Sequence, residues 1–195
     1  MNRQSSIVNR RLVLASASPR RAELLRNAGI AFAAQATRVP ERRRRGESPR
    51  KFAERLAREK ARAIRARNPH RLVLGADTVV IVGGKVLGKP RNRRDAARML
   101  RLLSGRAHQV TTAVCLIGPG FEDVRSETTQ VTMRKLSERE VRDYVASGEP
   151  MDKAGAYAIQ GLASRWISRI EGCYFNVVGL PVPLVYRMLR AHGRL

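Results

Sequence analysis

The chain has 195 residues, and its 39 Lys and Arg against 16 Asp and Glu give it a formal net charge of +23. This length suits one domain, or at most two small lobes, with a substantial core. The sequence holds no apolar run of about 18 residues that could span a membrane. Its two cysteines and three scattered histidines form no disulfide framework and have no metal-ligand spacing, which argues against a zinc site.

We expect residues 1–195 to form a single domain, with residues 1–10 as a poorly ordered N-terminal extension. This extension lacks the apolar core of a secretory signal, and the two cysteines are expected to be reduced thiols. Both features favour a cytoplasmic location. Any bound metal should be a hard cation held by carboxylates.

Positive charge is concentrated in the first half of the chain, residues 1–106. Such a surplus favours a polyanionic ligand, which could be the phosphates of a nucleotide or a nucleic acid backbone. The run Arg42-Arg43-Arg44-Arg45 could bind nucleic acid, but it has no interleaved aromatic residues on which bases could stack. A solvated loop is the simpler interpretation of this run.

The first elements are a strand over residues 12–15 and a helix from Pro19 to about residue 28. Ser18 is a good N-cap, Pro19 suits the first helical position, and Gly29 provides the stop. The first turn then carries Arg20 and Arg21, although a helix N-terminus favours negative charge. This arrangement indicates a bound phosphate, with a solvated arginine pair as the alternative.

A short strand over residues 30–36 precedes a long helix that begins at Ser48-Pro49 and runs to about residue 67. Lys60 falls inside the apolar stripe of this helix. A lysine on an inward face is unfavourable unless it meets an anion or extends to the surface. The residues expected to form the apolar stripe are Phe52, Ala53, Leu56, Ala63 and Ile64.

Residues 71–76 read as a buried strand that continues through residues 79–82, turns at Gly83-Gly84 and returns through residues 85–87. Asp77 lies where the two apolar runs meet. With so much positive charge around it, this carboxylate should stay ionised. It could cap a turn, or it could serve as a metal ligand or water-activating base beside a phosphate site.

The second half predicts further strands and helices, separated by a Gly-rich segment over residues 153–161. Asn92 should cap a helix, and Ser137 with Glu140 forms a capping box for another. The expected elements are a helix to residue 103, paired strands over 110–117 and 127–133, a helix to residue 146, a strand over 166–170, and a last amphipathic helix containing Leu184, Val185, Met188 and Leu189.

Together these segments resemble the Maf family of nucleoside triphosphate pyrophosphatases over nearly the whole chain, from Leu12 to Leu189. Tyr157 and Gln160 resemble the subfamily that acts on dTTP and UTP, rather than the sister subfamily that acts on 7-methyl-GTP. The segments that carry the resemblance are residues 14–21, 75–78, 88–90, 154–161 and 176–181.

The resemblance implies an α/β fold like that of inosine triphosphatase, an elongated mixed β-sheet flanked by helices with a central nucleotide-binding cleft. It implies hydrolysis between the α- and β-phosphates of a nucleoside triphosphate, with Mg²⁺ or Mn²⁺ as cofactor. It also suggests a homodimer and an influence on septum formation. The alternatives are a 7-methyl-GTP pyrophosphatase and a basic nucleic-acid-binding protein.

The resemblance also assigns roles to single residues. Asp77 matches the proton acceptor, and Arg20, Thr78 and Gln160 match positions that select the substrate. Asp77 and Glu41 would hold the metal, although the family commonly has two adjacent acids where this chain has Pro40-Glu41. The positions that match polar, phosphate-binding residues of the cleft are Ser16, Arg20, Arg21, Lys60 and Lys89, with Glu41 beside them.

Overall fold

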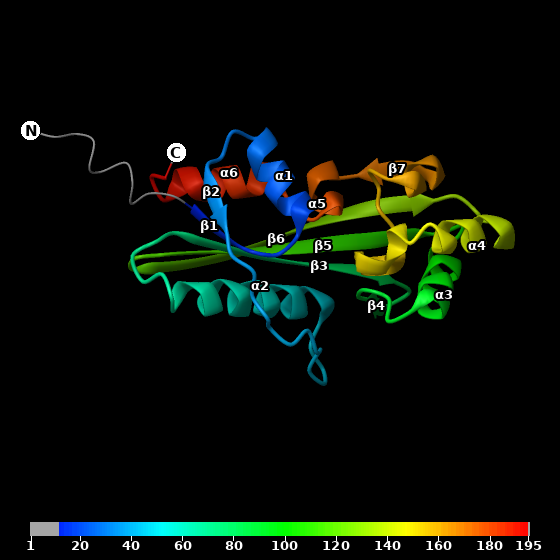
Figure 1. Ribbon diagram of the computed structural model, residues 1–195, viewed down its shortest axis with the longest axis horizontal. Helices are drawn as coiled ribbons and strands as arrows, with labels where there is room; N and C mark the ends of the chain where they lie inside the picture. Colours follow the sequence, from blue (N-terminus) through cyan, green and yellow to red (C-terminus); the bar gives the residue numbers. More distant parts are fainter. Residues whose placement is uncertain (1–11, 195) are drawn as a thin grey trace, which may run out of the picture. The chain divides into compact units, whose positions relative to one another are not determined.

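The structure is a computed structural model that describes residues 12–194. The extension expected over residues 1–10 lies outside the described residues. A seven-stranded mixed sheet has the strand order β2-β1-β3-β5-β6-β7, with β4 paired to β3 (Figure 1). The α/β class with a mixed sheet flanked by helices is therefore confirmed.

The strands are β1 (Leu12–Ala15), β2 (Phe32–Ala34), β3 (Val73–Val82), β4 (Lys85–Leu87), β5 (Ala107–Gly118), β6 (Phe121–Met133) and β7 (Ile167–Glu171). The α-helices are α1 (Pro19–Asn27), α2 (Pro49–Arg65), α3 (Arg93–Leu103), α4 (Glu138–Ala146), α5 (Tyr174–Val178) and α6 (Val182–Ala191). Short 3₁₀ helices are η2 (Glu149–Asp152), η3 (Ala154–Ala156) and η4 (Leu162–Trp166).

The described residues divide into two compact units. The first comprises residues 12–77, 112–127 and 179–194, and the second comprises residues 78–111 and 128–178. Strands β3, β5 and β6 continue from one unit into the other.

In the first unit, β1 pairs in parallel with β2 on one side and with β3 on the other. Helix α2 covers one face of these strands, and α1 and α6 cover the opposite face (Figure 1). The core under α1 and α6 contains Leu14, Leu25, Leu74, Leu116 and Val185.

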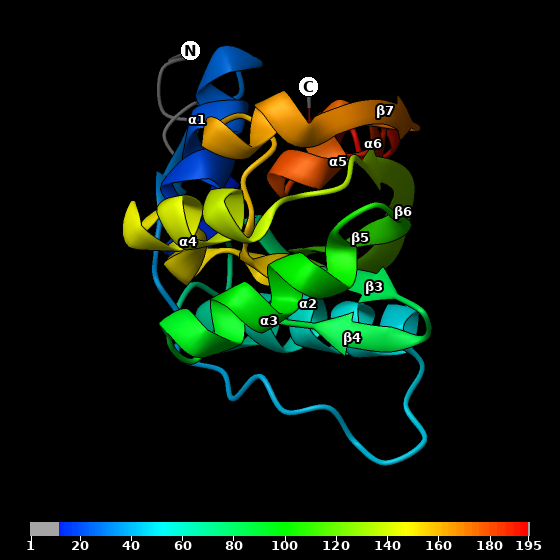
Figure 2. The same cartoon turned by 90° about the vertical axis from the view of Figure 1, so that its right-hand side faces the viewer.

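In the second unit, β3 turns through Gly83-Gly84 into antiparallel β4, and β6 pairs with antiparallel β7. Both turn glycines have positive φ, at 52° and 73°, which explains the sequence signal for a hairpin. Helix α3 lies beside β4 and packs against α4 (Figure 2). This unit has a core of its own, which includes Val80, Leu100, Val131, Tyr144 and Trp166.

The predicted helix starts are confirmed, because Ser18, Ser48, Asn92 and Ser137 are all N-caps and Ser137 forms the capping box with Glu140. The predicted continuation of the strand from residues 71–76 into residues 79–82 is also confirmed, because β3 is one strand from Val73 to Val82. One residue of the expected apolar stripe of α2 was wrong. Ala63 is exposed, and Ala57 and Ala61 complete the buried stripe instead.

The start of β6 was also predicted wrongly, at residue 127 instead of Phe121. The segment reads as a loop because it is charged. In the structure, however, Glu122 accepts hydrogen bonds from Arg58 and Arg62 of α2, at 2.8 and 2.7 Å. The acidic residue at the start of β6 is thus paired with two arginines of α2, so its charge does not indicate a solvent-exposed loop.

Candidate active site

The turn between β1 and α1 is built around two serine hydroxyls. Ser16 is buried, and its Oγ accepts hydrogen bonds from the Ser18 backbone N–H at 3.1 Å and from Arg21 Nη1 at 3.3 Å. Ser18 Oγ accepts from the Arg21 backbone N–H at 3.5 Å as the N-cap. The first turn of α1 has no acidic residue, so Arg20 and Arg21 stand at its positive end as the sequence indicated.

Arg21 joins three segments of the first unit. Its Nε donates to the Gly179 carbonyl at 2.8 Å, and its Nη1 donates to the Ala76 carbonyl at 2.9 Å. These bonds fix the start of α1 beside the part of β3 that leads into Asp77. Arg21 therefore organises the backbone of the site, a contribution that the sequence did not reveal. Arg20 lies next to it and is half-buried.

Gly75 allows α2 to approach β3 closely. A Cβ atom added at Gly75 would lie 2.2 Å from the Ala57 carbonyl oxygen and 2.8 Å from the Ala61 backbone nitrogen. The helix backbone thus packs directly on the strand, two residues before Asp77. This close contact brings Lys60, on the buried face of α2, opposite Asp77.

Lys60 binds two carboxylates. Its Nζ lies 2.6 Å from Asp77 Oδ1 and 2.6 Å from Glu41 Oε1. The side chains of Lys60 and Asp77 are 10% and 8% exposed, whereas that of Glu41 is 45% exposed. The expectation that an inward lysine meets an anion is confirmed, with protein carboxylates as the anions.

Burial raises the pKa of Asp77 above its ordinary value, while Lys60 and Arg21 lower it and Glu41 raises it further. Our expectation from charge alone considered only the cations. The structure adds removal of the carboxylate from water, which is the largest effect here. Asp77 is therefore a carboxylate that accepts a proton more readily than an exposed aspartate.

The remaining predicted site residues, Thr78, Lys89 and Gln160, belong to the second unit. Thr78 is half-buried within β3, while Lys89 and Gln160 are exposed. The segment leading to Gln160 is attached next to Lys89, because the Gly155 N–H donates to the Gly88 carbonyl at 3.0 Å. Gly155 has φ 70°, and a Cβ there would lie 2.9 Å from Val80, so this attachment requires glycine.

Tyr144 and Glu149 hold the chain on both sides of Gln160, and sequence reasoning missed them. The Tyr144 hydroxyl donates to Glu149 Oε1 at 2.7 Å and accepts from the Ala158 N–H at 3.2 Å. Glu149 Oε2 accepts from the Leu162 N–H at 3.1 Å. The sequence carries a trace of this contact in the glycine at position 161. A side chain would not fit there, because a Cβ would lie 2.4 Å from the Glu149 carboxylate.

Comparison with known proteins identifies the family. The family model described as "Maf-like protein" matches residues 11–192. The chain belongs to this family. It is 57% identical over 184 residues to the dTTP/UTP pyrophosphatase of Koribacter versatilis, a match that covers 94% of this chain and 95% of the relative.

Other relatives of this Maf-like chain carry the same name. The dTTP/UTP pyrophosphatase of Syntrophomonas wolfei is 53% identical over 92% of this chain and 96% of its own length. That of Symbiobacterium thermophilum is 51% identical, over 93% of this chain and 94% of its own length. The predicted family resemblance is confirmed.

The fold of this Maf-like chain is similar to a solved structure titled "The structure of the Staphylococcus aureus Ham1 protein". The TM-score is 0.51, and the match covers 94% of this chain and 100% of that one. At 14% identity, the similarity concerns the fold alone.

Asn176, part of a segment that carried the resemblance, has a structural role in the second unit. It is fully buried, and its Nδ2 donates to the Val110 carbonyl and to Thr129 Oγ1, both at 2.9 Å. These bonds anchor the short helix α5, which the sequence analysis did not predict, to β5 and β6.

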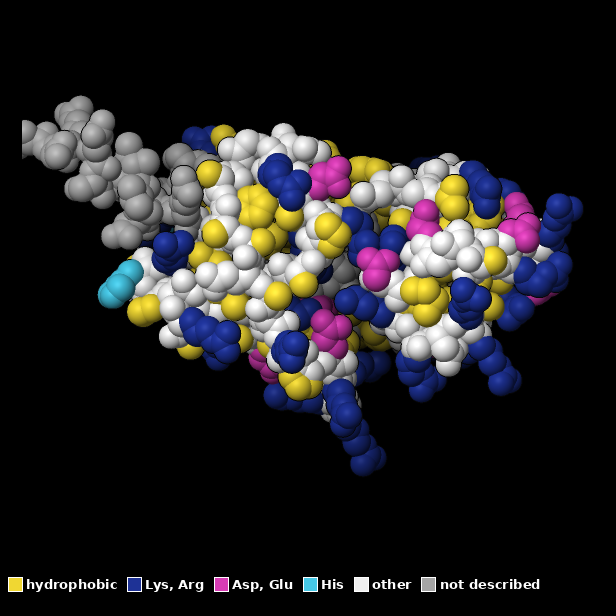
Figure 3. Space-filling view, viewed as in Figure 1, with side chains coloured by type: hydrophobic (Ala, Val, Ile, Leu, Met, Phe, Trp, Pro, Cys, Tyr) yellow, Lys and Arg dark blue, Asp and Glu magenta, His cyan; other side chains and the backbone are white. Residues whose placement is uncertain are grey.

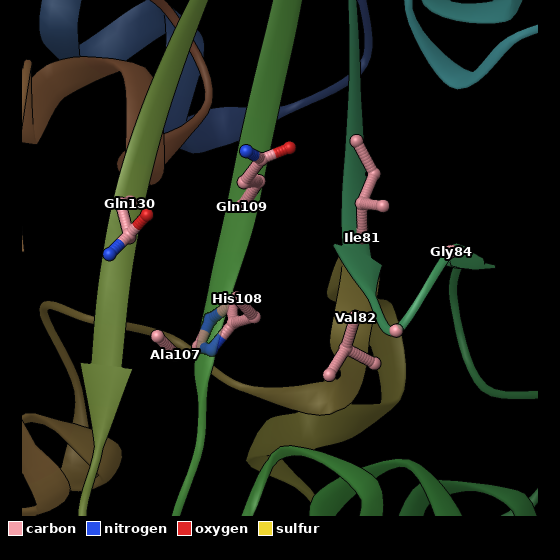
Figure 4. Close-up of a pocket in the computed structure, with 8 residues that line it drawn as sticks. Ile81, Val82, Gly84, Ala107, His108, Gln109 and Gln130 are labelled. Carbon is pink, nitrogen blue, oxygen red and sulfur yellow. The ribbon is translucent and has the colours of Figure 1, made fainter.

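A hollow of about 270 Å³ in the second unit is separate from the predicted residues. Figure 4 shows Gln109 and Gln130 on neighbouring strands, with His108 beside them and Gly84 at one side. None of the predicted site residues lines this hollow. Its lining offers amide groups and no acid or basic side chain other than His108, whose pKa is lowered to about 4 by burial.

The two carboxylates on Lys60 also form a donor set that fits a divalent cation. Among residues 12–194, no group of three or more His, Cys, Asp and Glu side chains is arranged to hold a metal ion. Mg²⁺, however, is commonly bound by one or two carboxylates together with substrate phosphates and water. Glu41 and Asp77 therefore suit an ion that is shared with a nucleotide.

No helix within the described residues is long and apolar enough to cross a membrane.

Proposed function

We propose that this protein is a nucleoside triphosphate pyrophosphatase that hydrolyses dTTP and UTP to the nucleoside monophosphate and diphosphate. Support comes from membership of the Maf-like family and from relatives of 51–57% identity that are named dTTP/UTP pyrophosphatase. The observation that carries the proposal is the buried Asp77, held at 2.6 Å by Lys60 beside the arginine pair of α1.

Asp77 accepts the proton of the attacking water. The water oxygen forms a bond to the α-phosphorus as the bond to the oxygen bridging to the β-phosphorus breaks, and diphosphate leaves with that electron pair. Lys60 and Arg21 act against the burial effect on the pKa of Asp77, so they favour the ionised form that a base requires. When bound, Mg²⁺ or Mn²⁺ held by Glu41 and Asp77 would neutralise phosphate charge.

Arg20, Arg21, Lys60 and Lys89 bind the phosphates and compensate the charge that develops on the leaving diphosphate. In phosphoryl transfer, such positioning and charge compensation supply most of the acceleration. Ser16 keeps the Arg21 guanidinium in place through its hydroxyl.

Thr78, Gln160 and Arg20 select the nucleotide. An amide side chain offers both a donor and an acceptor, which matches the alternating groups on the edge of a pyrimidine. Tyr144 and Glu149 fix the backbone on both sides of Gln160 and so limit the positions that its amide can reach.

The direct test is to incubate the protein with a panel of nucleoside triphosphates and Mg²⁺ or Mn²⁺ and to measure diphosphate release. We expect dTTP and UTP to be cleaved in preference to the other nucleotides. Preference for 7-methyl-GTP would assign the chain to the sister subfamily. No release from any nucleotide, together with tight and salt-sensitive DNA binding, would refute the enzyme and favour a nucleic-acid-binding protein.

Nucleic acid binding is the weaker candidate because the face shown in Figure 3 has no surface made of basic side chains alone. Lys and Arg are spread over the face shown in Figure 3, with Asp and Glu among them. Many are also paired, as in the contacts of Arg58 and Arg62 with Glu122.

We also propose that the protein is a cytoplasmic homodimer, and an influence on septum formation remains a prediction. Both cysteines, Cys115 and Cys173, are free thiols, as is typical of a reducing compartment. Light scattering coupled to size-exclusion chromatography would measure the mass. A mass equal to one chain of 21.8 kDa at micromolar concentration would contradict the dimer.

A further inference from the structure

Arg55 of α2 and Glu47 of the preceding loop form a two-point ion pair. Arg55 Nε donates to Glu47 Oε1 at 2.7 Å, and Nη2 donates to Glu47 Oε2 at 2.9 Å. Their side chains are only 13% and 10% exposed. Paired N–H donors on one carboxylate fix orientation as well as distance, which a lysine cannot do.

The same pair holds the loop that carries Glu41. Arg55 Nη2 also donates to the Arg42 carbonyl at 2.9 Å, and Glu47 Oε2 accepts from the Arg44 N–H at 3.0 Å. Arg42 directly follows Glu41, the residue that accepts from Lys60. Arg55 thus binds the carbonyl of the residue that follows Glu41.

Regular backbone structure does not position Glu41. Residues 35–48 between β2 and α2 contain no helix or strand. A loop of this length costs conformational entropy to order, and that cost must be offset by side-chain contacts. The charged contacts of Arg55 meet this requirement, and the ion pair with Arg55 lowers the pKa of Glu47 to about 2, so the pair persists at neutral pH.

We propose that Arg55 and Glu47 are positioning residues that hold Glu41 against Lys60 and Asp77. This inference rests on the proposed function, in which Glu41 helps to bind the divalent cation. Arg55 and Glu47 act on the reaction through Glu41 and do not themselves touch the nucleotide.

The test uses the full-length variants Glu47→Gln, Arg55→Met and Arg55→Lys. Glu47→Gln preserves shape, so it keeps the test valid if Arg55→Met fails to fold. The matched control is Arg50→Met. Arg50 is an exposed arginine of the same helix, and its Nε lies 2.8 Å from Glu54 Oε1. The measurements are kcat, KM for dTTP, and binding of Mn²⁺ alone.

We expect Glu47→Gln and Arg55→Met to lower kcat about tenfold or more, because small misplacements of catalytic groups are costly. Mn²⁺ binding should weaken as it does in Glu41→Gln, and Arg55→Lys should recover only part of the loss. The double variant Glu41→Gln with Arg55→Met should be no slower than Glu41→Gln alone, since Arg55 acts through Glu41.

Folded Arg55 and Glu47 variants with the kcat and Mn²⁺ affinity of the unmodified protein would overturn the proposal. Losses that multiply in the double variant would do the same. If the unmodified protein hydrolyses no nucleotide, the proposed function fails, and hydrogen exchange then tests the positioning separately. Faster exchange over residues 38–46 in Arg55→Met, but not in Arg50→Met, supports it, and equal exchange refutes it.

Discussion

The proton affinity of Asp77, the proposed base, is set by two opposing effects, burial and the nearby cations. Because burial raises its pKa, the acidic limb of kcat/KM should lie above the ordinary aspartate value of about 3.9. A plot of kcat/KM from pH 4 to pH 8 measures this limb. A profile that stays flat down to pH 4 would contradict the raised pKa.

Substituting Asp77→Asn removes the proton acceptor while keeping the size of the side chain. We expect kcat to fall by about 10²–10⁴-fold, the usual contribution of a general base. The variant should still fold and bind nucleotide, which circular dichroism and calorimetric titration can show. Unchanged turnover would remove Asp77 from the mechanism.

Substituting Lys60→Met leaves the buried carboxylate of Asp77 without its closest cation. The pKa of Asp77 should then rise further, because burial and Glu41 both raise it. When the pKa of Asp77 is higher in the folded state than in the unfolded state, the protein keeps its stability at pH values below the unfolded-state pKa. It loses stability as the pH rises and the buried carboxylate ionises. The deficit should thus be small near pH 4 and reach about 3–5 kcal/mol at pH 7.

Urea unfolding of Lys60→Met at several pH values measures this deficit. The control is the double variant Lys60→Met with Asp77→Asn, which also removes the charge of Asp77, so the pH dependence caused by that carboxylate should disappear. A deficit in Lys60→Met that does not change with pH would show that Lys60 contributes by packing alone.

The sequence singled out Lys60 and Asp77 but did not predict the contact between them. Lys60 was conspicuous because a charge interrupts an apolar stripe, and Asp77 because it stands alone between apolar runs. That the anion for Lys60 is Asp77 itself could not be predicted, since the contact depends on how α2 packs on β3. The Arg55–Glu47 pair was missed because ordinary surface ion pairs have the same sequence pattern.

At the scale of elements, the contact between α2 and β3 depends on Gly75. We expect Gly75→Ala to destabilise the protein by about 1–3 kcal/mol, because the added methyl meets the helix backbone, which cannot rotate away as a side chain would. Activity should also fall, as α2 carries Lys60. Urea unfolding and kcat measure the two effects.

Gly88→Ala is the matched control for stability, because a Cβ at Gly88 would meet nothing within 4 Å. Equal stability of the two variants would mean that α2 adjusts to the methyl group without cost.

Helices and strands were predicted correctly where the sequence signal is local, and wrongly where it depends on residues far away in the chain. Helix starts at Ser18, Ser48, Asn92 and Ser137 were right because a cap is completed within four residues. The start of β6 and the existence of α5 were not predicted, since they depend on distant partners. These partners are Arg58 and Arg62 for Glu122, and Val110 and Thr129 for Asn176.

At the scale of the whole molecule, two apolar cores are connected by shared strands. Each unit has its own core, yet β3, β5 and β6 are continuous across both. Neither core can lose its strands without disrupting the backbone of the other, so we expect one cooperative unfolding transition. Hydrogen exchange measured at increasing denaturant should show that the amides of β1 and α3 lose protection at the same denaturant concentration.

The variant Leu100→Ala tests this coupling, because Leu100 is fully buried in the second core. It should cost about 2–5 kcal/mol and lower the denaturant midpoint of β1 and α3 alike. Protection of β1 that persists after α3 has exchanged would demonstrate two independent folding units.

The tyrosine that holds the segment around Gln160 also touches the only tryptophan of the chain. The ring of Tyr144 meets that of Trp166 edge-on with centroids 5.0 Å apart, and the indole N–H donates to Glu140 Oε1 at 3.2 Å. The side chain of Tyr144 therefore links the Trp166 indole to the backbone of Ala158. A nucleotide that shifts the Gln160 segment should change the emission of Trp166, so substrate binding can be followed optically without an added dye.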